Sequence, residues 1–177
     1  ASATQLEASI NNFQQSLTLP DQTNQEKAFT YRTIAQVQSI LKNCPGYEPA
    51  TVLQDVVTNY EQAITLDPTN PLYWHNKARF SYSLWRNLPP DTGPAAREWL
   101  FSGLADNDMA LTLNPVDSTN QGYVPNVWEN YFLNAIGSTL TRAPGPSLGC
   151  WGGRSVGDPS ATLATLATSV ALAFAFT

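Results

Sequence analysis

The sequence predicts an all-α fold in which antiparallel helical hairpins stack as a solenoid, and three observations support this prediction. A short stretch occurs three times, apolar side chains recur at helical spacing, and proline or glycine interrupts the pattern between the periodic segments. The three copies of the stretch are SLTLP at 16–20, AITLDP at 63–68 and ALTLNP at 110–115. Their last leucines, Leu19, Leu66 and Leu113, lie 47 residues apart, which is the mark of a repeat architecture.

The first three expected helices follow from apolar stripes that run between breaks. Residues 4–19 carry apolar side chains at steps of four, three and four, and Pro20 stops the helix because it cannot continue the hydrogen-bond ladder. Residues 25–43 form the second helix, which ends before a Pro-Gly pair. The third begins at Pro49 and runs to Asp67.

The next three helices begin at prolines, which sacrifice no hydrogen bond at the first helical position. Asn70 caps the fourth helix, which runs from Pro71 to Asn87; the fifth spans 94–113 and the sixth starts at Pro125. Their apolar stripes are rich in aromatic residues, and we expect these residues mainly in the core. The alternative is that they line a groove for a peptide or a sugar. These residues are Trp74, Tyr82, Trp85, Trp99, Trp128, Tyr131 and Phe132.

Residues 60–71, YEQAITLDPTNP, resemble the junction between two tetratricopeptide (TPR) repeats. In that family an aromatic residue, a small residue and Leu-x-Pro close one hairpin, and a Trp opens the next; here Trp74 and then Ala78 follow, with Trp128 after the third copy. The resemblance covers most of residues 1–140, but the family period of about 34 residues is lengthened to 47. It implies TPR-like helical hairpins and a protein-binding scaffold without catalysis of its own.

The repeat core is expected at the recurring positions of this pattern. Two positions depart from the family, because Lys77 stands where an apolar residue is usual and Asn107 replaces the aromatic residue before the third copy. The expected core residues are Phe13, Leu17, Leu19, Tyr60, Ala63, Leu66, Trp74, Ala78, Ala110, Leu113 and Trp128.

Composition changes abruptly after the last helix. We expect a helical repeat domain over 1–142, a Pro/Gly-rich loop over 143–158 and an apolar tail over 159–177. Residues 161–176 contain no charge and fit either a helix or a half-buried β-strand, since both periodicities are present. A membrane span is the least favoured, because the segment is shorter than about 20 residues and lacks a basic anchor.

With either structure, we expect the tail to need a partner. A strand would have no other strand of this chain to pair with, and an apolar last helix would lack the polar outer face that terminal repeats of a soluble solenoid carry. The first repeat lacks its front half, which predicts an open acceptor surface there. Together they predict head-to-tail association, and a heterologous contact that does not close extends into a filament. The expected self-association residues are Leu163, Leu166, Val170, Leu172, Phe174 and Phe176.

The two cysteines, Cys44 and Cys150, are expected to form a structural disulfide, with two unpaired thiols as the alternative. Closing a loop of 106 residues would stabilise the chain by roughly 4 to 5 kcal/mol in the entropy model. Such a bridge suits a protein outside the cell.

Charge and composition exclude several classes of function. Only 13% of residues are charged and the net charge is −5, with the nine basic residues unclustered, so we expect no nucleic-acid partner. An amide- and hydroxyl-rich surface favours an extracellular or cell-surface location. The chain has no Asn-x-Ser/Thr sequon, so any glycan would be O-linked, for instance within 155–169.

No constellation of residues predicts catalysis, a cofactor or a metal. His75 is the single histidine and has no partner at fixed spacing, and the acidic residues Asp106, Asp108 and Asp117 lack the glycine and glutamate of a calcium loop. We therefore expect a non-enzymatic, extracellular structural protein that assembles into a filament or fibre through its tail. The alternative is a monomeric secreted or periplasmic TPR-like adaptor that binds a peptide of another protein.

Overall fold

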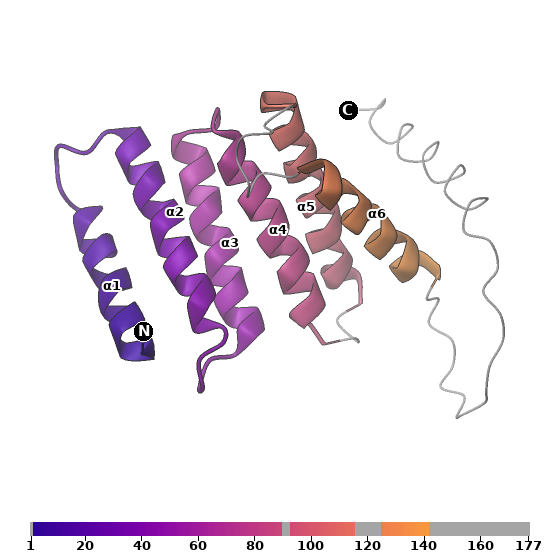
Figure 1. Ribbon diagram of the computed structural model, residues 1–177, viewed down its shortest axis with the longest axis horizontal. Coiled ribbons are helices and arrows are strands. Elements are labelled where there is room, and N and C mark those ends of the chain that lie inside the picture. The colour runs from indigo at the N-terminus through magenta and orange to yellow at the C-terminus, as the bar shows by residue number, and fades with distance from the viewer. Residues whose placement is uncertain (1, 90–92, 116–124, 142–177) are drawn as a thin grey trace. The chain divides into compact units, whose positions relative to one another are not determined.

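The computed structural model describes residues 2–89, 93–115 and 125–141, and the regular secondary structure in these parts is helical throughout (Figure 1). The six expected helices are confirmed there, and their boundaries lie within a few residues of the predicted ones. The helices are α1 (Ala3–Ser16), α2 (Asn24–Leu41), α3 (Pro49–Leu66), α4 (Pro71–Asn87), α5 (Pro94–Leu113) and α6 (Pro125–Thr141).

Local sequence signals fix where the helices begin. Ser2 and Thr23 form capping boxes with Gln5 and Glu26, so that each pair satisfies backbone N–H groups that the helix leaves open. The Thr23 hydroxyl accepts from the Glu26 amide at 3.2 Å, and the Glu26 carboxylate accepts from the Thr23 amide at 2.8 Å. The helices α3, α4, α5 and α6 each start at a proline, as expected.

The first helix ends earlier than predicted, at Ser16 rather than Leu19, and the repeat explains why. In the second and third copies Asp67 and Asn114 precede the proline and leave the helix at φ −144° and −148°. The α region is sterically disfavoured for a residue that precedes a proline. The first copy lacks this extra residue, so Leu19 itself precedes Pro20 and takes the non-helical place, and 16–19 close in a tight turn.

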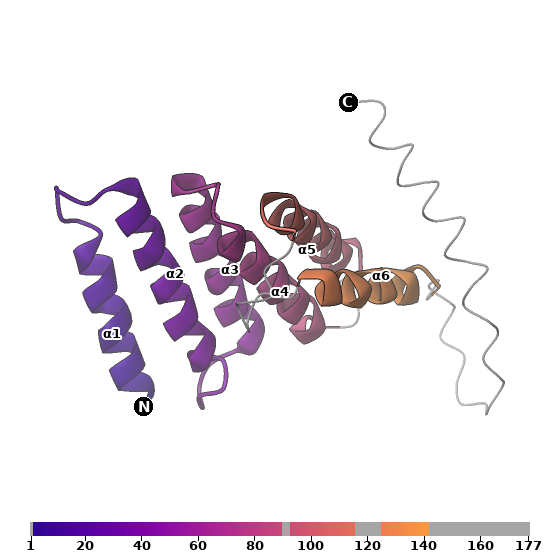
Figure 2. The same ribbon diagram turned by 45° about the horizontal axis from the view of Figure 1, so that its top comes forward.

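From α1 to α5 each helix packs beside the next one along the chain as an antiparallel neighbour (Figures 1 and 2). Helix α6 packs on α4 and α5 through Phe132. The buried clusters join three consecutive helices, so that every inner helix contributes to the core on both of its sides. The clusters are Leu6, Ile10, Ile34, Leu41 and Val52 from α1 to α3; Ala28, Ala63, Ile64 and Tyr73, and Ala35, Val56 and Tyr60 with Phe80, from α2 to α4; and Ala78, Leu100, Phe132, Ala135 and Ile136 from α4 to α6.

By its contacts the chain divides into two units, Ala1–Ile136 and Gly137–Thr177, and only the end of α6 is described in the second. The expected loop 143–158 and tail 159–177 lie outside the described residues. None of the helices in the described part combines the length and hydropathy that a membrane span requires.

Candidate functional site

Polar side chains are buried on two consecutive helices, α4 and α5. They are His75, Asn76 and Ser81 of α4 and Asp106 and Asn107 of α5. Buried polar groups are costly unless they are hydrogen-bonded or paired, so these residues are candidates for a functional role.

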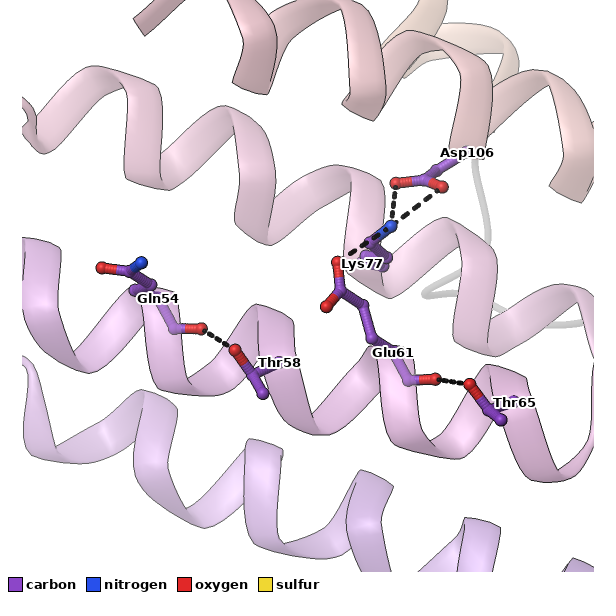
Figure 3. A network of polar contacts seen from close by, with 6 residues as sticks. All are labelled: Gln54, Thr58, Glu61, Thr65, Lys77 and Asp106. Atoms are coloured by element: carbon purple, nitrogen blue, oxygen red, sulfur yellow. Dashed lines mark hydrogen bonds and ion pairs between the residues drawn. The ribbon is translucent and has the colours of Figure 1, made fainter. Parts of the chain in front are cut away.

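Next to Asp106, the Lys77 ammonium of α4 lies between two carboxylates from different helices (Figure 3). Lys77 Nζ is 3.1 Å from Oδ2 and 3.3 Å from Oδ1 of Asp106 in α5, and 3.3 Å from Oε1 of Glu61 in α3. Lys77 and Asp106 are largely buried, whereas Glu61 is about half exposed. One side chain of α4 therefore ties together the helices on either side of it.

Burial dominates the electrostatics of this network. It raises the pKa of Asp106 to about 6, and the nearby Lys77 ammonium only partly opposes this effect. A raised carboxyl pKa often marks a catalytic acid, but it also arises in structural ion pairs. Here the carboxylate is enclosed between packed helices, so the arrangement orients α3, α4 and α5 relative to one another.

Metal binding finds no support in the described part of the chain, where no three His, Cys, Asp or Glu side chains gather closely enough to hold an ion. His75 is completely buried in α4 and so lies away from any solvent-borne substrate.

A second feature is the aromatic cluster between α4 and α6, at whose centre lies Tyr82. Its ring packs edge-on against Trp128 and Phe132, with centroids 5.5 Å away in both cases, and Trp85 lies at 5.4 Å. Tyr131 joins the cluster at 6.1 Å but is half exposed. The rings pack mainly against one another as core, in line with the favoured expectation.

A shallow hollow lies at the start of α2, lined by Thr23, Glu26, Phe29 and Thr30 among others. It is wide open to solvent, and its charged group, Glu26, is already engaged in the capping box with Thr23. Those hydrogen bonds to Thr23 lower the pKa of Glu26. The hollow is therefore explained by the way α2 begins.

A third feature is an apolar stripe on the outer side of α5, formed by Phe101, Ala105, Met109 and Leu113 and called here the α5 stripe. Phe101 is 46% exposed, Met109 41% and Leu113 38%. Residues four apart lie on one side of a helix, so these side chains form a continuous row.

Of the eleven expected repeat-core residues, four are buried, five are half-buried and two are exposed. Tyr60, Ala63, Ala78 and Ala110 are buried, and Phe13, Leu17, Leu66, Trp74 and Trp128 are half-buried. Leu19, at 55% exposed, and Leu113 lie on the surface. The leucine that marks the repeat thus lies at or just beyond a helix end, where it is only partly covered.

Cys44 is a free thiol, half-buried after the end of α2, so the expected disulfide is not formed in the structure. Its thiol faces its own helix end, with Sγ 4.0 Å from the carbonyl oxygen of Ile40. Cys150, like all six expected self-association residues of the tail, lies outside the described residues.

Sequence reasoning missed the Lys77–Asp106 pair and the α5 stripe. The available signal for the pair is Lys77 itself, a charged residue at a position that is usually apolar in the repeat pattern. The stripe could have been found by aligning the exposed positions of successive repeats.

The fold defines the class of this protein: over the described residues it is an all-helical protein whose six helices pack sequentially and antiparallel. Comparisons of the chain with protein-family models, curated proteins and solved structures found no match.

Proposed function

We propose that this chain is a TPR-like, non-enzymatic structural subunit outside the cell that associates with copies of itself through its apolar C-terminal tail. The observation that carries the proposal is the absence of any charged residue in 161–176, in a chain whose other surfaces are largely amide and hydroxyl. An apolar segment of this length gains free energy only when it is covered. If the tail of each copy binds the next copy, the association continues from copy to copy and produces a filament.

The helical part is suited to such a subunit because its consecutive helices are held together firmly. Its clusters join consecutive helices, and the Lys77 network cross-links three of them, so α3 to α5 are held in fixed register. A repeat of this kind transmits load from one hairpin to the next because each contacts mainly its neighbours.

The front of the repeat is a poor candidate for the acceptor. The exposed residues of α1 are Thr4, Gln5, Glu7, Ala8, Asn11, Asn12, Gln14 and Gln15. This surface is polar except for one alanine, as in a capping helix, and would leave an uncharged tail without apolar contact. A surface elsewhere on the molecule is therefore the better candidate for the acceptor of the tail.

The test compares the full chain with a tail variant that carries Val170→Asp and Phe174→Asp. We expect the wild type to form large species in sedimentation velocity and fibres in electron microscopy, and the tail variant to stay monomeric with an unchanged helical circular dichroism signal. Equal size distributions for the two proteins would overturn the proposal. A wild type that is a stable monomer at all concentrations would favour the peptide-binding adaptor.

A further inference from the structure

The α5 stripe stands out when the outer positions of the repeat are compared. Counting back one period of 47 residues from Phe101, Ala105 and Met109 leads to α3, and counting back two leads to α1. The equivalent residues are Gln54, Thr58 and Gln62 in α3, and Glu7, Asn11 and Gln15 in α1. All six are polar and exposed, and the Thr58 hydroxyl donates to the carbonyl of Gln54 within its own helix (Figure 3).

Phe101, Ala105 and Met109 are therefore not required by the stacking of the repeats, whereas Leu113, the fourth residue of the α5 stripe, is the leucine that all three copies share. In α3 the same positions remain exposed even though α4 and α5 follow along the chain. Helix stacking therefore does not cover these positions, and the repeat does not need apolar residues there. Phe101, Ala105 and Met109 are departures confined to one copy, on a side that the solenoid leaves free.

We propose that the α5 stripe is the acceptor for the apolar tail, residues 161–176, of a second copy of this chain. The inference rests on the proposed self-association and names the surface that receives the tail. Both partners are apolar, and the tail brings no charge that would have to be desolvated.

We expect the docked tail to be helical, because a strand laid on a helix surface would leave its backbone N–H and C=O groups without protein partners. Its apolar positions then extend from Leu163 to Phe174. At about 1.5 Å per residue this row is roughly 17 Å long, against roughly 18 Å for the α5 stripe from Phe101 to Leu113. The two rows match in length and pack as helix against helix.

The test uses a stripe variant, Phe101→Gln with Met109→Gln, which places on α5 the residues that α3 carries at the equivalent exposed positions. These substitutions suit the repeat, so circular dichroism and the thermal midpoint should stay close to wild type. We expect the concentration for half-assembly to rise at least ~tenfold, because two large apolar contacts are lost.

Mixing the stripe variant with the tail variant, Val170→Asp with Phe174→Asp, provides the decisive measurement. The stripe variant keeps an intact tail and the tail variant keeps an intact stripe, so each is expected to be monomeric alone and the mixture to form a one-to-one dimer. The absence of that dimer in sedimentation velocity would overturn the inference.

The failures of the two proposals are distinguishable. If the wild type is monomeric, tail-mediated assembly itself is wrong. If the tail variant is monomeric but the stripe variant assembles as well as the wild type, assembly stands and the α5 stripe is not its acceptor. A matched control, Phe29→Gln with Ile40→Gln, removes two side chains of α2 that are 56% and 51% exposed and should leave assembly unchanged.

Discussion

The ring of Phe132 in α6 lies directly against the backbone of Gly103 in α5. A Cβ atom at residue 103 would be 2.5 Å from Cε1 and 2.6 Å from Cζ of that ring, and 3.3 Å from Cβ of Ser81 in α4. Phe132 and Ser81 are both completely buried, so neither can move away easily. The absence of a side chain at Gly103 is what allows α6 to approach α5 and α4 this closely.

Gly103→Ala should therefore destabilise the protein, although alanine is the better helix former. Helix propensity favours alanine over glycine by roughly 1 kcal/mol, whereas overpacking a core costs about 1–3 kcal/mol. We expect a net loss of about 1 kcal/mol in the free energy of unfolding, measured by urea denaturation. A variant as stable as the wild type would show that α6 is free to shift.

Gly137→Ala in α6 is the matched control for that substitution. A Cβ atom at residue 137 meets nothing within 4 Å, so only the helix propensity changes. This variant should gain about 0.5–1 kcal/mol in the free energy of unfolding. Opposite signs for the two Gly→Ala substitutions would separate packing from propensity within one protein.

The helix pattern was open to prediction because it depends on local signals. The prolines that begin α3 to α6 and the repeated Leu-x-Pro stretch act on their immediate neighbours in the chain. The early end of α1 was also readable in principle, because its copy of the motif lacks the residue that precedes the proline in the other two.

The contacts between helices could not be predicted in the same way. Gly103 reads in the sequence as a weak point in a helix, and only the rotation of α5 against α6 turns it into a contact for Phe132. Likewise, Lys77 reads as a misplaced charge until the packing of α5 brings Asp106 to it. Such partners lie far apart in sequence, so periodicity carries no information about which of them meet.

Tyr60→Phe is expected to stabilise the protein or leave it unchanged. The Tyr60 hydroxyl is buried and has no hydrogen-bond partner among the described residues, and burial raises the pKa of this phenol to about 12. The ring stacks on Phe80 with centroids 5.6 Å apart, a contact that phenylalanine keeps. Removing an unsatisfied buried hydroxyl should gain up to about 1 kcal/mol in the free energy of unfolding.

Tyr47, whose hydroxyl is hydrogen-bonded, is the comparison for Tyr60. The Tyr47 hydroxyl donates to the Glu7 carboxylate, which links the loop after α2 to α1. Tyr47→Phe should therefore lower the free energy of unfolding under the same conditions. If Tyr60→Phe is destabilised as much as Tyr47→Phe, the Tyr60 hydroxyl has a hydrogen-bond partner after all.

The buried carboxyl of Asp106 should give the protein a pH-dependent stability. Burial raises the pKa of Asp106 from 3.8 to about 6, so the folded state binds this proton more tightly than the unfolded chain does. Its stabilising contribution is thus fully present below about pH 4 and is lost as the pH rises through about 6. A shift of about two pKa units corresponds to roughly 3 kcal/mol.

Asp106→Asn cannot titrate and should lose this dependence. Between about pH 4 and pH 7 the free energy of unfolding of the wild type should fall by roughly 3 kcal/mol relative to that of the variant. Urea denaturation across this range measures the difference. Parallel curves for the two proteins would mean that the Asp106 carboxyl is solvated in the folded state.

Removing one partner of the Lys77–Asp106 pair should lower the free energy of unfolding strongly, whereas replacing both partners with apolar residues should change it little. Lys77→Met leaves the Asp106 carboxylate buried without its ammonium partner, which should cost about 3 kcal/mol at neutral pH. Adding Asp106→Leu removes that orphaned charge, so the double variant should recover to within about 1 kcal/mol of the wild type. Glu61→Gln, at the half-exposed end of the network, should change stability by no more than about 0.5 kcal/mol.

A double-mutant cycle measures this coupling directly, with urea denaturation of the wild type, both single variants and the double variant. Lowering the pH provides an independent check, because protonation of Asp106 in Lys77→Met neutralises the unpaired group and should recover most of the lost stability near pH 4. If the effects of the two single substitutions simply add, the ammonium and the carboxylate do not depend on each other. In that event the register of α3, α4 and α5 would rest on apolar packing alone.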